Sequence, residues 1–254
     1  MCWGILRDIM RYVCLLVFLC VVTTTVSGEY SARVDVETGW LWVGRADVRI
    51  PGDEGTRFSF TGDLDADDTA YFRGRISWRP APRHFLAVTA APLEAEASGT
   101  LRRETLFVDT VFPADERVKA NFQFNNYRLT YRYRLRETER LAFDLGGTLF
   151  VRDARVVLES DERRDSDYDL GLVPLLSFGV SWNIQPRTSV VLDGDALAAP
   201  QGRAFDVLLA LEHHLREHLQ LGAGYRILEG GADNDDVYTF AMFHHAAVYM
   251  GWLF

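Results

Sequence analysis

The chain has 254 residues, of which 36 are acidic and 27 are basic, and its net charge at pH 7 is −9. An acidic chain lacks the basic surface that nucleic-acid binding requires, so we expect no nucleic-acid partner. The three cysteines, Cys2, Cys14 and Cys20, all lie near the N-terminus, which excludes disulfides and thiolate metal sites from the remainder.

Residues 1–28 have the features of a secretory signal peptide. Arg7 and Arg11 precede the apolar run 12–22, and residues 26–28 supply small side chains for a cleavage site. The apolar run is shorter than the ~20 residues that a membrane-spanning helix needs, so an uncleaved membrane anchor is the less favoured alternative. We predict a signal peptide at 1–28 and a single domain at 29–254.

Strand patterns begin soon after the predicted cleavage site. From Val34 to Ile50 the residues alternate with period two, and Trp40 and Trp42 fall on one face. Residues 127–135 repeat this pattern with tyrosines and leucines opposite arginines. An arginine on the lipid face of a membrane barrel costs roughly 2–4 kcal/mol at the midplane, so these arginines are expected to face the lumen.

The connections between alternating segments are of two kinds. Short turns are predicted at 80–82, 136–139, 185–187 and 216–217, and longer polar connections at 51–67, 96–118, 159–168, 197–203 and 229–236. This plan predicts ten strands, with both chain ends on the side of the short turns, as in outer-membrane barrels. Eight and twelve strands remain alternatives, because 100–112 could add a hairpin and the phase of 83–94 is ambiguous.

The C-terminal residues 246–254 form an alternating apolar segment that ends on Phe254. A secreted chain that ends in this way is typical of bacterial outer-membrane barrels. We therefore predict an all-β fold, a transmembrane antiparallel up-and-down β-barrel of about ten strands in the bacterial outer membrane. The expected partners are outer-membrane lipid, including lipopolysaccharide, and the barrel-assembly machinery through the C-terminal strand. A soluble lipocalin-like barrel is the alternative fold.

Aromatic side chains close to the short turns and on the first strand are predicted to lie at the two membrane interfaces. They are Trp40, Trp42, Trp78, Tyr131, Tyr133, Trp182, Trp252 and Phe254.

Charged residues of both signs occupy the inward positions of the predicted strands. The cluster comprises Asp144, Asp193, Asp195, Asp206, Glu212, Arg73, Arg75, Arg128, Arg132, Arg152 and Arg226. Opposite charges that face each other across a narrow lumen are expected to pair, because unpaired buried charges are costly. The sequence thus favours a packed, salt-bridged lumen, and a narrow selective pore is the alternative.

Candidate chemistry is sparse. Asp193 and Asp195 precede the 197–203 connection and are expected at the outer rim, where they could act as a general acid and base; pairing with lumen arginines is the favoured interpretation. His244 is expected near the outer interface without a catalytic partner. The chain has no phosphate loop, no GxSxG and no HExxH. We predict no catalytic residue, no metal site and no cofactor.

Five segments carry a resemblance to a family of small, uncharacterised bacterial outer-membrane β-barrel proteins. They are residues 49–56, 127–133, 147–153, 198–203 and 228–236. The resemblance implies the same fold and membrane but no activity. The pairs Asp63/Asp65 and Asp193/Asp195 are similar to the paired carboxylates of the ten-stranded outer-membrane proteases, yet no histidine follows near the second pair.

The sequence predicts a non-enzymatic outer-membrane barrel with a structural or binding role, or a narrow channel. The alternative is a barrel enzyme that acts on lipid or peptide through outer-rim carboxylates.

Overall fold

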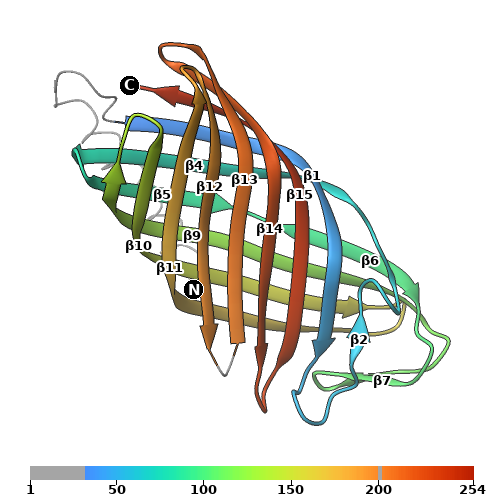
Figure 1. Ribbon diagram of the computed structural model, residues 1–254. Helices are drawn as coiled ribbons and strands as arrows, with labels where there is room; N and C mark the ends of the chain where they lie inside the picture. The colour runs from blue at the N-terminus through green and yellow to red at the C-terminus, as the bar shows by residue number, and fades with distance from the viewer. Residues whose placement is uncertain (1–31, 200–201) are drawn as a thin grey trace.

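A computed structural model describes residues 32–199 and 202–254, and its regular structure consists of β-strands (Figure 1). This part of the chain contains no helix that is long and apolar enough to cross a membrane.

Ten antiparallel strands close into one barrel, as the sequence predicts. The pairing between β9 and β10 joins the two ends of the sheet. The short strands β5 and β6 form a single wall strand, because both keep one register on β9, with Ala91 opposite Asn126 and Glu94 opposite Gln123. The wall strands are β1 (Ala32–Arg49), β4 (Thr69–Ala81), β5 (His84–Ala91), β6 (Glu94–Thr100), β9 (Arg117–Glu137), β10 (Leu141–Glu159), β11 (Arg164–Gln185), β12 (Thr188–Ala199), β13 (Gly202–Arg216), β14 (Leu219–Asp233) and β15 (Tyr238–Leu253).

The four short turns lie at one end of the barrel together with the two ends of the described wall. The N–H of Phe254 donates to the carbonyl of Ala32 at 2.9 Å, so β15 and β1 close the barrel side by side. The longer connections lie at the opposite end (Figure 1). In barrels of this kind the short turns face the periplasm, so we call the opposite end the outer end.

Three connections that the sequence predicts as long are short. The strands β10 and β11 stay paired as far as Glu159 and Arg164, β12 and β13 as far as Ala199 and Gly202, and β14 continues to Asp233. The predictions at 159–168, 197–203 and 229–236 were wrong because charged residues in the first and third segments, and proline and glycine in the second, were interpreted as loop residues. A strand that projects beyond the membrane can carry charges on its wet face and keep its ladder of hydrogen bonds.

The first strand changes its faces at a β-bulge between Val43 and Arg45. On the short-turn side of the bulge Trp40 points outward, as the alternation predicts. On its outer side Ala46 and Val48 are fully buried inside the barrel. The bulge inserts one extra residue and so exchanges inward and outward positions. The single period inferred from Val34 to Ile50 is therefore interrupted.

The outer end of the lumen is filled by apolar side chains. The connections at 51–67 and 96–118 contain β2 (Phe58–Ser59), β3 (Asp65–Ala66), β7 (Thr105–Phe107) and β8 (Thr110–Phe112), and their phenylalanines are almost completely buried. The sequence prediction treated these connections as polar and missed this packing. We call the cluster the outer apolar core: Leu41, Ala46, Val48, Ile50, Phe58, Phe60, Leu64, Leu93, Ala95, Ala97, Leu101, Phe107, Phe112, Val118, Ala120, Phe122, Phe124, Phe150, Val156, Leu158, Leu175, Leu228, Ala241 and Phe243.

Outward-facing positions nearer the short turns are apolar and exposed, which is the pattern expected of a wall in contact with hydrocarbon. Large exposed side chains include Phe72, Ile76, Val88, Leu129, Leu149, Leu172, Leu209 and Met250. The ambiguous segment at 83–94 is settled, because Ala87 and Thr89 are buried inside while Val88 is exposed.

We expect Phe122→Ala to lower the free energy of unfolding by about 3–5 kcal/mol, because it leaves a cavity in the outer apolar core. The Phe122 ring lies 5.9 Å from the rings of Phe60 and Phe243, and its side chain is buried. Urea unfolding of the refolded barrel in lipid vesicles measures the loss. The control is Val111→Ala, because the side chain of Val111 on β8 is exposed and its truncation should cost less than about 0.5 kcal/mol. Equal losses for the two variants would contradict the packing described above.

Candidate functional site: the charged lumen and its vestibule

Asp206 on β13 is the centre of an ion-pair network in the middle of the lumen. Its carboxylate receives guanidinium groups from three strands: Arg73 at 2.9 Å, Arg128 at 2.7 Å and Arg226 at 2.5 Å. Arg73 and Arg128 come from the wall across the lumen, whereas Arg226 lies on the neighbouring β14. All four side chains are buried. The network therefore bridges the lumen between its opposite walls.

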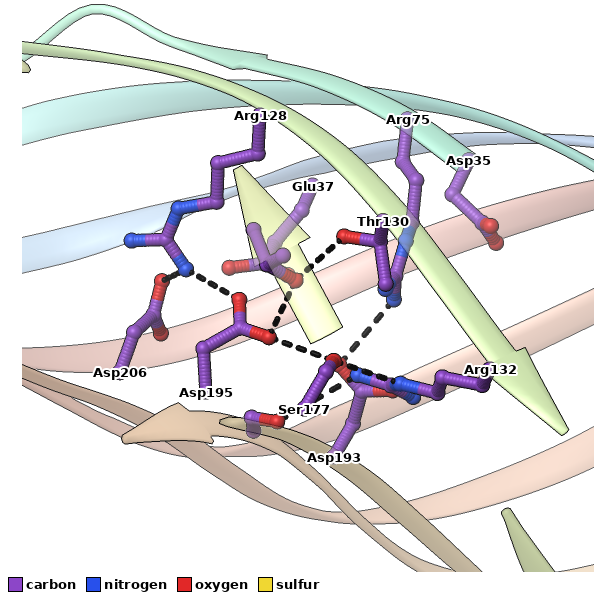
Figure 2. Close-up of polar contacts among 12 residues, drawn as sticks. Asp35, Glu37, Arg75, Arg128, Thr130, Arg132, Ser177, Asp193, Asp195 and Asp206 are labelled. Atoms are coloured by element: carbon purple, nitrogen blue, oxygen red, sulfur yellow. Dashed lines mark hydrogen bonds and ion pairs between the residues drawn. The ribbon is translucent and has the colours of Figure 1, made fainter. Parts of the chain in front are cut away.

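Asp195 on β12 is held by one arginine and two hydroxyl groups. Arg128 Nη1 lies 2.8 Å from Oδ2, and the hydroxyls of Thr148 and Ser177 donate to Oδ1 at 2.8 and 2.6 Å. Figure 2 shows Arg128 between the carboxylates of Asp195 and Asp206. One guanidinium thus joins two carboxylates of neighbouring strands.

Asp193 lies two residues closer to the short turns and has its own partners. Its two carboxylate oxygens accept from Arg132 at 2.5 Å and from Arg75 at 3.1 Å (Figure 2). Arg132 also donates from Nε to Ser177 at 2.8 Å. Ser177 therefore connects Arg132, the partner of Asp193, to Asp195.

Glu37 extends the network to β1, which lies next to β4 in the wall. Arg226 donates to both of its oxygens, at 2.9 and 2.8 Å, and the hydroxyl of Tyr71 donates at 2.9 Å. Charges removed from water are tolerated only where opposite charges and hydrogen bonds compensate them, and every carboxylate of this network has such partners. The arrangement is a packed polar core across the lumen.

The remaining predicted charges lie around this centre. Glu212 pairs with Arg33 at 2.8 Å, and Asp144 accepts from Nε of Arg134 at 2.7 Å. Arg152 instead pairs with Asp169 on the neighbouring β11.

A cavity of about 410 Å³ lies between the network and the short turns. Its lining includes Thr138 and Asn183 beside the turns and reaches inward to Asp193 and Arg226. We call it the vestibule. On one wall the guanidinium groups of Arg75, Arg79 and Arg132 each lie 5.6–5.7 Å from the centre of the Phe85 ring. The Nε of Arg75 is buried there without a hydrogen-bond acceptor.

The lumen therefore has three successive zones: the vestibule, the ion-pair network and the outer apolar core. Asp193 and Asp195 lie in the middle zone and not at the outer rim, where the sequence prediction put them. The cause is the shortness of the connection after β12, together with the outer apolar core, which includes Leu175 of the adjacent strand. Both carboxylates are paired with arginines; Asp195 is buried, whereas Asp193 is half-buried and borders the vestibule.

The other carboxylate pair lies outside the lumen network. Asp63 accepts from the backbone N–H of Ser59 at 2.9 Å, and Asp65 is exposed on the short β3. Asp63 thus stabilises an outer connection.

Several partners in the network were not predicted. Arg33, Tyr71, Thr148 and Ser177 occupy inward positions of their strands, and the alternation alone could have identified them. Tyr71 is adjacent to the outward Phe72 and so points inward, where its hydroxyl requires a buried acceptor, here Glu37.

The predicted interface aromatics all lie on the outward face or at the end of the chain. Trp40, Trp78, Tyr131, Trp182, Trp252 and Phe254 are exposed, and Trp42 and Tyr133 are half-buried. Trp42 stacks on His244 with 5.6 Å between ring centres, and the hydroxyl of Tyr225 lies 2.5 Å from His244 Nδ1. Contact of these rings with lipid headgroups stays a prediction.

Residues 32–199 and 202–254 contain no group of three or more histidine, cysteine, aspartate or glutamate side chains suited to hold a metal ion.

Removing one shared guanidinium should strongly destabilise the barrel. Arg128→Met leaves Asp195 and Asp206 buried with one partner fewer each, so the free energy of unfolding should fall by about 3–5 kcal/mol. The matched control is Arg163→Met at the outer end, whose partly exposed pair with Glu116 should contribute less than about 1 kcal/mol. Urea titrations of both variants in vesicles make the comparison, and a loss at Arg128 no larger than at Arg163 would disprove the structural role of the network.

No family model and no curated protein matches the chain. Among solved structures, the fold is similar to that of the outer membrane protease OmpT from Escherichia coli, with a TM-score of 0.55 and 10% identity over 92% of this chain and 99% of that chain. Weaker likenesses include the transport unit of the autotransporter AIDA-I from Escherichia coli, with a TM-score of 0.44 and 7% identity over 92% of this chain and 94% of that chain. Another is Ail, the attachment invasion locus protein of Yersinia pestis, with a TM-score of 0.39 and 10% identity over 87% of this chain and 99% of that chain.

At these identities the likeness concerns the fold. The closed antiparallel barrel, its exposed apolar outer wall and its charged interior are together the features of a bacterial outer-membrane β-barrel. The chain is a barrel protein of that class.

Proposed function

We propose that this barrel does not conduct ions and has a structural or binding role in the outer membrane. The observation that carries the proposal is the filling of the lumen by two successive layers, the ion-pair network and the outer apolar core. An ion that crossed the barrel would have to separate buried pairs and then pass through a layer of phenylalanines, and both steps are unfavourable.

The narrow-channel function has less support, because the ion-pair network and the outer apolar core fill the lumen beyond the vestibule. The same vestibule supports a binding role, because it is a blind cavity whose walls carry arginines and carboxylates. A blind pocket that opens toward the short turns would receive its ligand from the periplasm.

Lipopolysaccharide and other outer-membrane lipids are the partners we propose for the outer wall. Arg45 and Arg203 lie 5.6 and 5.5 Å from the ring of Phe240, and Arg49 and Arg57 each lie 5.1 Å from the ring of Tyr238. Arginines on an outward face near the outer end can bind lipid phosphates. We also propose that β15, with its terminal Phe254, is the segment that the barrel-assembly machinery recognises.

The alternative function, a barrel enzyme that uses Asp193 and Asp195, loses its main support. Both carboxylates are committed to arginines, and Asp195 is 4% exposed. A general acid or base must reach its substrate within hydrogen-bond distance. Asp195 is buried, and Asp193, although it borders the vestibule, already accepts from Arg75 and Arg132.

Planar-bilayer recording of the purified barrel tests the proposal. We expect no discrete conductance steps from protein whose folding is verified by a heat-dependent shift on gels, because the lumen is blocked twice. An open outer-membrane porin in the same bilayer is the positive control for incorporation. Regular ion-selective steps from the folded barrel would overturn the proposal and make the charged network a selectivity filter.

A further inference from the structure

The barrel wall is split between β4 and the strand formed by β5 and β6. Along one edge β4 pairs with β1 from Thr69 to Trp78, but along its other edge the pairing with β5 stops at Gly74 and Ala90. Farther toward the outer end, β6 pairs with β9 and with the short β3 instead. Within the described residues, no strand pairs with 69–73 on this side, which leaves a lateral slot.

Pro92 gives a physical reason for the split. If the register of Gly74 and Ala90 continued, Pro92 would lie opposite Phe72. The carbonyl of Leu93 accepts from Phe124 of β9 at 2.8 Å, so the backbone groups of residue 92 point the other way, toward β4. Proline has no N–H to donate there, and the ladder between the two strands ends at this position.

The slot leads from the outer wall into the apolar interior. A pocket lies at this place, and its lining combines the outward Phe72 with Leu41 and Leu93 of the outer apolar core. Tyr71, also in the lining, packs against that core. The floor of the slot is therefore made of apolar side chains, although its mouth is on the outside of the barrel.

The slot lies at the outer border of the apolar wall. Phe72 is 52% exposed, and Ile76 and Trp78 on the same face of β4 are exposed as well. On β9 the outward side chain changes from Leu129 to the polar Asn125 and Gln123, which line the slot. Unpaired backbone groups are tolerated in a membrane only where water or polar headgroups reach them, which agrees with this height. The site thus offers a polar rim above an apolar floor.

We propose that this slot is a docking site for an acyl chain of an outer-leaflet lipid. The chain lies against Phe72 and Leu93, and its headgroup lies beside Glu94 and Gln123. The occupant follows from the surroundings: bilayer hydrocarbon is the medium in contact with Phe72, and an apolar recess that opens into it is filled by that medium at the smallest cost. This docking does not depend on whether the lumen conducts.

Site-specific quenching tests the proposal. The protein is exported, purified from outer membranes and checked by intact mass for loss of residues 1–28, which removes all three native cysteines. A bimane fluorophore is attached to Leu93→Cys in the slot, and the protein is reconstituted in phosphatidylcholine vesicles with or without brominated acyl chains. The controls are Val88→Cys on the lipid-facing wall and Leu101→Cys, buried in the outer apolar core.

We expect brominated chains to quench the fluorophore at 93 at least half as strongly as that at 88, and to leave that at 101 unchanged. Quenching at 93 no greater than at 101 would overturn the proposal, because the slot would then be closed. Quenching at 93 by aqueous iodide but not by bromine would overturn it too, because the slot would hold water. A second reporter, Thr69→Cys, lies across the slot. If the fluorophore at 93 has only disturbed its own surroundings, the fluorophore at 69 will still be quenched by brominated chains.

Pro92→Val tests the origin of the slot on the same reporter. Valine supplies the missing N–H, so the ladder to β4 can extend and bromine quenching at 93 should fall severalfold, with the gel shift of the folded barrel retained. Unchanged quenching would contradict the role of Pro92.

Discussion

Compensation of charge inside the lumen is the constraint on which the membrane-embedded part of this barrel depends. A strand whose outer face contacts hydrocarbon must turn its polar residues inward, and ten such strands collect arginines and carboxylates in a narrow space. Asp206, which three guanidinium groups reach from both walls, shows how the conflict is resolved. Eight wall strands contribute to the network, namely β1, β4, β9, β10, β11, β12, β13 and β14, so these strands must assemble in one register for the charges to be paired. The network thus specifies the register of the barrel and stabilises it.

The outer part of the barrel follows the opposite rule. Beyond the membrane the outer face is wet, so the outward positions carry residues such as Lys119 and Asn121, and the apolar residues turn inward. The bulge after Val43 allows β1 to satisfy both rules, since it places Trp40 on the lipid side and Val48 in the interior. One chain therefore combines an inside-out segment with a segment that packs like a soluble protein. The outer apolar core follows from this change of solvent, from lipid to water, along the barrel axis.

The ion-pair network and the outer apolar core both affect which functions are open to the barrel. They leave space at the periplasmic end, where the vestibule lies, and at the side, where the wall opens between β4 and β6. On this basis we propose that the barrel holds molecules and does not pass ions.

The sequence by itself determined the barrel, its short-turn end and the inward direction of residues such as Arg128 and Arg132, because alternation with period two is a local property and lipid penalises exposed charge. It favoured ten strands but left eight and twelve open, and the closed sheet decided the number. It did not determine which carboxylate each arginine meets, since the partners Arg128 and Asp206 are 78 positions apart and meet only when the barrel closes. The burial of Phe107 and Phe112 could not be inferred either, because phenylalanines in a polar connection reveal no packing partner. Tertiary structure also decided that Asp193 and Asp195 lie in mid-lumen, because the length of neighbouring strands, and not the sequence around the pair, sets where the outer rim is.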